Sequence, residues 1–197
     1  MSAMRVPRES DRPADGTVQE AGGKHVLRFE RRLGHPIDRV WKALTDPQEI
    51  SGWLGSAEID LVEGGRVTLR WLNPIGPEEI AKYRIDIPEE LAGEQPVHRG
   101  TITQLDPPRV LECDLENFGE LRWELSEEGP GSVLTFTHSL PAVEDHMVAQ
   151  VLAGWHFHLD ALEGVLAGRR IDWPNWLIER WAEHRGRYAA VDRGGSH

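Results

Sequence analysis

Residues 141–168, PAVEDHMVAQVLAGWHFHLDALEGVLAG, predict one long amphipathic helix, and this helix constrains the fold more than any other segment. One broad side is apolar and carries Met147, Val151, Trp155, His158, Leu162 and Val165 along its centre. The opposite side, which we expect to face water, carries Ala149, Ala153, His156, Asp160 and Glu163. Pro141 suits a first helical turn and Gly168 suits a helix end. The rest of the chain must therefore supply an apolar surface that this helix can cover.

Short runs of alternating apolar and polar residues precede the helix and predict antiparallel strands. The runs are residues 24–33, 58–61, 67–71, 98–105, 109–115, 121–125 and 133–140. Turn-forming residues separate several of them, including Gly64-Gly65, Asp106-Pro107-Pro108 and Gly129-Pro130-Gly131. The one-sided apolar pattern is typical of an antiparallel sheet with one face in water. We expect an α+β fold, with a curved sheet of about six to seven strands covered by the long helix.

Two short helices are predicted after the first strand, from Pro36 to about Thr45 and from Pro47 to Trp53. Residues 73–97 are rich in Pro, Gly and Glu, and we expect an excursion there with one short strand around residues 83–87. Residues 1–23 lack apolar periodicity and predict a disordered N-terminal tail. Residues 24–170 then form one domain.

Residues 171–197 predict a Trp-rich helical extension with a frayed end. Its apolar residues could pack on the outside of the long helix near Phe157 and Ala161, or against a second subunit of a homodimer. These residues are Trp173, Trp176, Leu177 and Trp181. The pattern does not separate the two arrangements.

Charge and cysteine content exclude several classes of protein. A net charge of −11 lacks the basic footprint that a nucleic-acid surface requires. The single Cys113 excludes an internal disulfide, and there is no apolar run long enough for a membrane span or a signal peptide. We therefore expect a cytoplasmic protein that binds neither nucleic acid nor membranes and carries no cofactor.

Four motifs resemble the family of activator of heat-shock-protein ATPase homologues, within the helix-grip, START-like or SRPBCC superfamily. They are HPIDRVWKALTDPQEISGWLG, Glu63-Gly64-Gly65, Asp106-Pro107-Pro108-Arg109 and GWHFHLDALEGVLAG, and the resemblance covers residues 24–168. It implies a curved sheet that grips the long helix around a cavity. The lining would be Trp41, Trp53, Leu69, Trp71, Trp123, Phe136, His138, Trp155, His158 and Leu162. Functions in the family range from co-chaperone domains to the binding or detoxification of lipophilic molecules.

His138 and His158 interrupt otherwise apolar faces, and either imidazole could hydrogen-bond a ligand or shuttle a proton. Each could equally be a core histidine that is satisfied by backbone or water. A metal site is not expected at His156, His158 and Asp160, because helix positions two apart point in different directions. Cys113 is expected to be a core residue rather than a nucleophile.

Our leading hypothesis is the binding of a small lipophilic or polycyclic molecule between sheet and helix, oriented by His138 and His158. The first alternative is a co-chaperone-like interaction with another protein through Trp173, Trp176 and Trp181. The second is a cyclase or hydrolase that uses the same cavity, for which the sequence offers no complete catalytic set.

Overall fold

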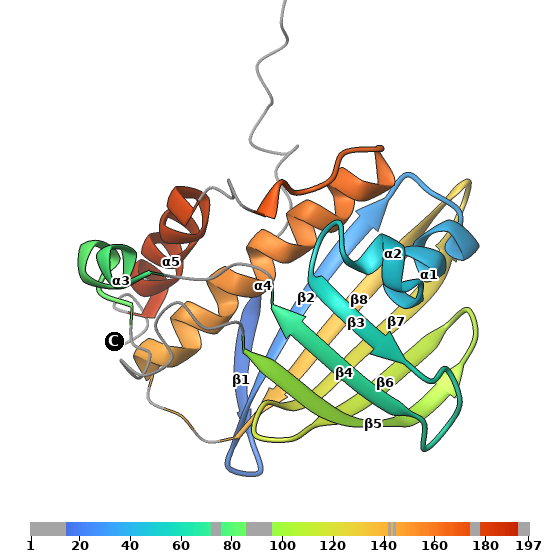
Figure 1. The fold of residues 1–197 in the computed structure, drawn as a ribbon, viewed down its shortest axis with the longest axis horizontal. Helices are drawn as coiled ribbons and strands as arrows, with labels where there is room; N and C mark the ends of the chain where they lie inside the picture. The colour runs from blue at the N-terminus through green and yellow to red at the C-terminus, as the bar shows by residue number, and fades with distance from the viewer. Residues whose placement is uncertain are drawn as a thin grey trace, which may run out of the picture.

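Eight strands form one antiparallel sheet in the computed structural model, which describes residues 15–71, 76–85, 96–141, 143, 145–173 and 178–192. The sheet order is β1-β2-β8-β7-β6-β5-β4-β3. The strands are β1 (Thr17–Ala21), β2 (Lys24–Leu33), β3 (Gly55–Ile59), β4 (Arg66–Trp71), β5 (Val97–Asp106), β6 (Val110–Leu115), β7 (Gly119–Glu128) and β8 (Gly131–Leu140). Figure 1 shows β2 beside β8, although the two are far apart in sequence.

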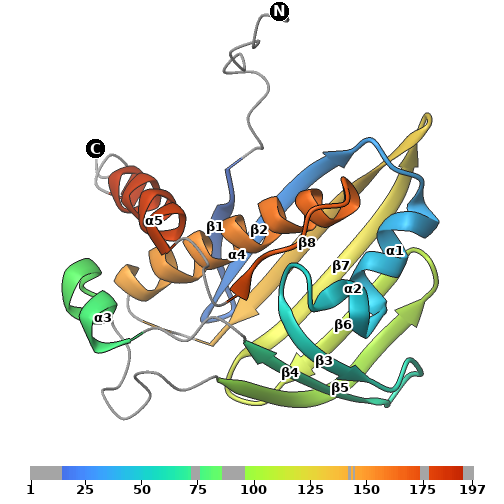
Figure 2. The same ribbon diagram turned by 45° about the horizontal axis from the view of Figure 1, so that its top comes forward.

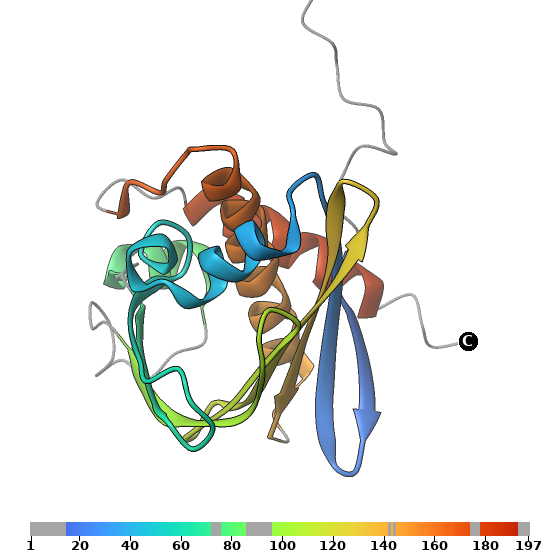
Figure 3. The same cartoon turned by 90° about the vertical axis from the view of Figure 1, so that its right-hand side faces the viewer.

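Five helices accompany the sheet in the described part of the chain. They are α1 (Ile37–Thr45), α2 (Pro47–Ile50), α3 (Pro77–Tyr83), α4 (Asp145–Leu166) and α5 (Ile178–Asp192). The sheet curves around α4, while α1 and α2 cover the end of the sheet near β3 (Figures 2 and 3). The predicted helix-grip architecture is confirmed, with one or two strands more than expected.

The helix α4 ends as its sequence predicts. Gly168 has a positive φ of 79°, and the N–H of Arg169 donates to the carbonyl of Gly164. The N–H of Gly168 donates to Val165, which completes the paired bonds of a Schellman cap. On the inner side of α4, Trp155, Leu159 and Leu162 are buried. The N-terminal boundary differs, because α4 begins at Asp145 rather than at Pro141.

The strand β1 corrects the prediction of a disordered tail for residues 17–21. It pairs with β2 through a tight turn at Gly22 and Gly23, both of which have positive φ. All five residues of β1 are exposed, so this edge strand is held by backbone pairing rather than by the apolar periodicity that reveals buried strands. Residues 1–14 lie outside the described residues.

The short strand predicted around residues 83–87 is wrong for the residues described there. Residues 77–83 form the helix α3, and Arg84 caps it in the left-handed region with φ of 50°. The sequence Gly76-Pro77-Glu78-Glu79 is a helix start, with proline in the first turn and acidic residues at the positive end of the helix. The alternation of Tyr83 and Ile85 misled the prediction. Residues 86–95 are not described.

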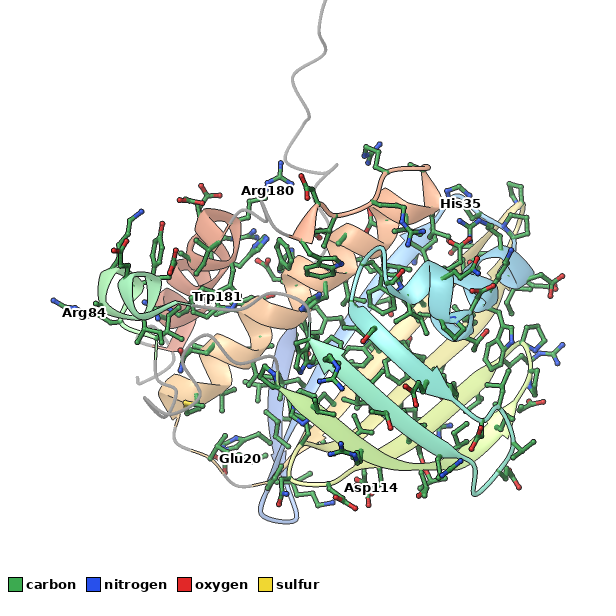
Figure 4. All side chains as sticks on the ribbon, viewed as in Figure 1. Glu20, His35, Arg84, Asp114, Arg180 and Trp181 are labelled. Carbon is green, nitrogen blue, oxygen red and sulfur yellow. The ribbon has the colours of Figure 1, made fainter. Side chains whose placement is uncertain are left out.

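The outer side of α4 does not face water. Ala149, Ala153 and His156 are all buried, because α5 packs along this side of α4. The buried Trp181 of α5 lies close to Gly154 of α4 (Figure 4). The C-terminal extension therefore packs on α4 within the same chain, one of the two predicted arrangements. No helix of the described residues is both long and apolar enough to cross a membrane.

Candidate functional site

Aromatic side chains fill much of the space between α4 and the sheet. The Trp155 ring lies 4.3 Å from that of Phe136 on β8 and 5.8 Å from that of Trp71 on β4. Phe118, in the turn between β6 and β7, packs against His138 at 4.6 Å and stacks on His98 at 4.3 Å. Aromatic side chains that were predicted to line a cavity, such as Trp71, Phe136 and Trp155, therefore largely pack against one another.

His138 uses both ring nitrogens inside the protein. Its Nδ1 accepts a hydrogen bond of 2.8 Å from the Trp155 indole N–H, so the proton resides on Nε2. That Nε2 donates to the carbonyl of Phe118 at 2.7 Å. Burial lowers the pKa of His138 to about 4, which keeps the ring neutral near pH 7. With both nitrogens satisfied, His138 is a structural histidine.

His158 also has a structural partner. Its Nδ1 donates to the carbonyl of Trp53 at 2.8 Å and so connects α4 to the segment after α2. The Trp71 ring covers the imidazole at 4.8 Å. Burial lowers the pKa of His158 to about 4. The two predicted anchors therefore serve mainly to connect α4 to β8 and to the segment after α2.

One pocket among the described residues lies beneath α1 and α2. It encloses about 20 Å³, which is room for about one water molecule. Its walls are almost entirely apolar and come from α1, α2, the segment after α2 and strands β3, β4, β6 and β7. The lining residues are Leu44, Ile50, Trp53, Leu54, Ile59, Val67, Leu69, Leu111, Cys113 and Trp123.

Three lining side chains carry a polar atom: Trp53, Trp123 and Cys113. The indole N–H of Trp53 donates to the carbonyl of Ala43 at 2.9 Å. The indole N–H of Trp123 is buried and has no hydrogen-bond partner among the described residues. The Cys113 thiol is buried too, and desolvation raises its pKa to about 12. A thiol with so high a pKa is not a nucleophile at neutral pH. The pocket therefore has an apolar wall that includes Trp123, whose indole N–H has no partner among the described residues.

The structure brings three of the ten predicted lining residues to this pocket: Trp53, Leu69 and Trp123. Another group packs together under α4, comprising Trp71, Phe136, His138, Trp155 and His158. Leu162 is buried in the core, and Trp41 on α1 is partly buried against it. The set that the family resemblance implied therefore divides between residues that line this pocket and residues that pack together under α4.

A polar cluster on the outer side of α4 was not predicted. Arg31 is buried on β2 and faces Asp160 and Glu163 of α4 at 3.7 and 3.4 Å. His156 and His184 contact the same Asp160 carboxylate, at 3.6 and 3.5 Å. The sequence contained one indication of this cluster: Arg31 is the one charged residue on the apolar face of its strand. Burial raises the pKa of Glu163, despite the neighbouring guanidinium.

The tryptophans that were expected to form an exposed docking patch are engaged within the chain where they are described. Trp181 is buried, and the N–H of Trp173 donates to the carbonyl of Ser51 at 2.7 Å. The Trp173 ring also approaches His158 at 6.2 Å. Trp176 lies outside the described residues. These contacts explain why Trp173 and Trp181 do not form an open surface.

Solved structures resemble this fold over most of its length. CalU16 from Micromonospora echinospora is 26% identical, with a TM-score of 0.62 over 90% of this chain and 94% of that one. The protein encoded by BPP1335 of Bordetella parapertussis is 28% identical, with a TM-score of 0.62 over 90% of each chain. An AHSA1-like protein from Aeromonas hydrophila, 22% identical, shares the fold with a TM-score of 0.55 over 73% of this chain and 94% of that one. No curated protein matches the chain in sequence.

The family comparison matches the same segment as the helix-grip elements. The sequence model described as Activator of Hsp90 ATPase homolog 1-like protein matches residues 34–167, from the start of α1 to the end of α4. This match covers more than half of the chain and includes all the walls of the apolar pocket. The chain therefore belongs to the family of Activator of Hsp90 ATPase homolog 1-like proteins.

Proposed function

We propose that this protein binds a small, mostly apolar molecule with one hydrogen-bond acceptor in the pocket beneath α1 and α2. The observation that carries this proposal is the unpartnered N–H of Trp123 in an apolar wall. A buried donor without a partner costs roughly 1–3 kcal/mol, and an acceptor on a ligand would recover that cost. Proteins with this fold often bind hydrophobic ligands.

The size of the pocket determines how a ligand enters. About 20 Å³ holds one water, whereas a ligand pocket commonly measures about 300 Å³ or more. A ligand larger than one water molecule can therefore enter only if part of the pocket wall moves outward. The wall formed by α1, α2 and residues 51–54 is the candidate, because α2 has only four residues and packs mainly on α1 and β3. We infer that α2 moves outward when the ligand binds.

A pair of matched probes tests the hydrogen bond separately from the apolar contact. Naphthalene supplies only apolar surface, whereas 1-acetylnaphthalene adds a carbonyl acceptor. We expect the wild-type protein to bind the ketone about tenfold more tightly, since one hydrogen bond is worth roughly 1.4 kcal/mol. Trp123→Phe keeps an aromatic ring and removes the donor, so its preference for the ketone should disappear. Isothermal titration calorimetry measures both affinities.

Trp41→Phe is the matched control, because Trp41 lies outside the pocket lining. It should retain the preference for the ketone. If neither probe binds the wild-type protein with Kd below about 100 μM, the pocket does not admit ligands and the proposal fails. Equal affinities of wild type and Trp123→Phe for the ketone would show that Trp123 is not the anchor.

The two alternatives receive less support from the described residues. Catalysis would need a histidine with a free ring nitrogen beside a nucleophile, but His138 has two internal hydrogen bonds and Cys113 carries a raised pKa. A co-chaperone role would need an exposed patch at Trp173 and Trp181, and Trp181 is buried. Small-molecule binding is therefore the function that this geometry supports best.

A further inference from the structure

Three metal-ligating side chains meet where α5 packs on α4. His156 and Asp160 are one turn apart on α4, and His184 approaches from α5. Their ligand atoms all lie within 4.8 Å of one another. The Asp160 carboxylate approaches the Nε2 atoms of both imidazoles, with Oδ1 3.6 Å from His156 Nε2 and Oδ2 3.5 Å from His184 Nε2. The two imidazole rings stack at 4.0 Å with an angle of 16° between them.

A neighbouring tyrosine orients one of the imidazoles. Tyr188 Oη accepts the backbone N–H of Gly16 at 2.8 Å and lies 2.7 Å from Nδ1 of His156. When Nδ1 donates to this oxygen, the lone pair of His156 resides on Nε2, the nitrogen nearer to Asp160. Metal-bound histidines are commonly held in this way by a hydrogen bond to the other nitrogen.

The carboxylate of Asp160, which approaches both imidazoles, is incompletely satisfied. Asp160 Oδ1 is buried and has no hydrogen-bond partner among the described residues, although Arg31 lies 3.7 Å away. Arg31 also faces Glu163, so one guanidinium stands against two carboxylates. A cation bound here could supply the partner that the buried oxygen of Asp160 lacks.

We propose that His156, Asp160 and His184 bind a divalent transition-metal ion of the zinc class. Two imidazoles and one carboxylate are donors that such ions prefer, and three protein ligands leave further coordination positions open. Bonds of about 2.0–2.2 Å to a tetrahedral ion place its ligand atoms roughly 3.3–3.6 Å apart. The separations of 3.6 Å from Oδ1 to His156 and 3.5 Å from Oδ2 to His184 lie within this range.

A solvent-open pocket gives the ion a route to this position. It has a volume of about 340 Å³, and both Asp160 and His184 line it. Ala161 and Gly164 of α4 also line it, together with Arg169, Arg170 and Arg180; Figure 4 labels Arg180. This metal site is separate from the apolar pocket under α1 and α2, and it does not depend on the proposed ligand.

Zinc titration of the full, untagged chain after removal of metals by a chelator tests the site. We expect one Zn²⁺ per chain by calorimetry. His184→Gln and Asp160→Asn should each weaken binding by more than about tenfold, since even partners in the outer shell of metal sites contribute that much. Tyr188→Phe should weaken it by about tenfold, because the aromatic ring remains while the orienting oxygen is lost. Co²⁺ in place of Zn²⁺ should give the intense visible absorption of a four-coordinate ion.

His35→Gln is the matched control, because His35 precedes α1 and is not one of the three proposed ligands, so the zinc affinity should stay unchanged. Circular dichroism confirms that each variant is folded. If His156→Gln does not fold, His184→Gln still tests the site, because its side chain is partly exposed on the outer helix. The site would be excluded by absence of saturable zinc binding to the wild type, or by the same affinity in His184→Gln and His35→Gln.

Discussion

The indole N–H of Trp155 on α4 donates a 2.8 Å hydrogen bond to Nδ1 of His138 on β8. This bond joins the long helix to the centre of the sheet, inside a core where both side chains are almost fully buried. It also fixes the tautomer of His138, whose Nε2 then donates to Phe118. One indole thus orients a histidine that positions the turn between β6 and β7.

Trp155→Phe should lower the free energy of unfolding by about 1–3 kcal/mol. The smaller ring keeps most of the apolar contact, but the buried Nδ1 of His138 loses its donor. Urea denaturation followed by circular dichroism measures the change. Trp41→Phe, on the partly buried face of α1, should cost less. Equal costs for the two variants would mean that the Trp155–His138 bond adds nothing.

The stability of the fold should fall as the pH decreases from about 6.5 to 4. Burial lowers the pKa of His138 and of His158 to about 4, whereas an unfolded histidine titrates near 6.5. The two histidines contribute fully to the free energy of unfolding above pH 6.5, because each is then neutral in both the folded and the unfolded state. This contribution is lost below that pH because the unfolded chain takes up protons first. Each histidine accounts for roughly 3 kcal/mol over this interval.

Urea midpoints between pH 7.5 and pH 4.5 measure this dependence. His158→Gln provides the comparison, because the glutamine amide can still donate to the Trp53 carbonyl but does not titrate. We expect a shallower decline for this variant than for the wild type. A wild-type midpoint that stays constant from pH 7 to pH 5 would show that neither histidine is buried in its neutral form.

Cys113 should react with thiol reagents only when the chain unfolds. Its side chain lies in the wall of the apolar pocket, and burial raises its pKa to about 12. At pH 8 very little thiolate is therefore present in the native state. Labelling by Ellman's reagent should be slow in buffer and complete in concentrated urea. Rapid labelling of the native protein would mean that the pocket opens readily to solvent.

Sequence periodicity predicted the gripping sheet, the two short helices and the long helix, because each of these elements buries one face. It could not predict β1, since all five residues of that strand are exposed and the strand is held by backbone hydrogen bonds. The face of α4 around Ala153 and His156 was also misjudged. Small and polar residues are compatible with water, yet they also allow a second helix to approach closely.

The candidate sites depend on three-dimensional packing that no one-dimensional pattern contains. Trp123 and Phe136 both lie on inward faces, but of the two only Trp123 lines the apolar pocket beneath α1 and α2. His156 and Asp160 are four residues apart and share a helix face, but the third potential ligand, His184, comes from α5. A pattern within one helix could suggest two members of this cluster at most.

Two glycines should respond in opposite ways to replacement by alanine. Gly154 lies within α4, and an added Cβ would meet only Trp181 Nε1 at 3.9 Å, an ordinary contact. Because glycine weakens a helix interior, Gly154→Ala should stabilise the protein by up to about 1 kcal/mol. In β5, a Cβ at Gly100 would lie 1.9 Å from the Asp114 carbonyl, which forces the strands apart. Gly100→Ala should therefore lower the melting temperature in calorimetry, and Gly154→Ala should raise it. A destabilising Gly154→Ala would mean that α5 packs more closely on α4 than a methyl group allows.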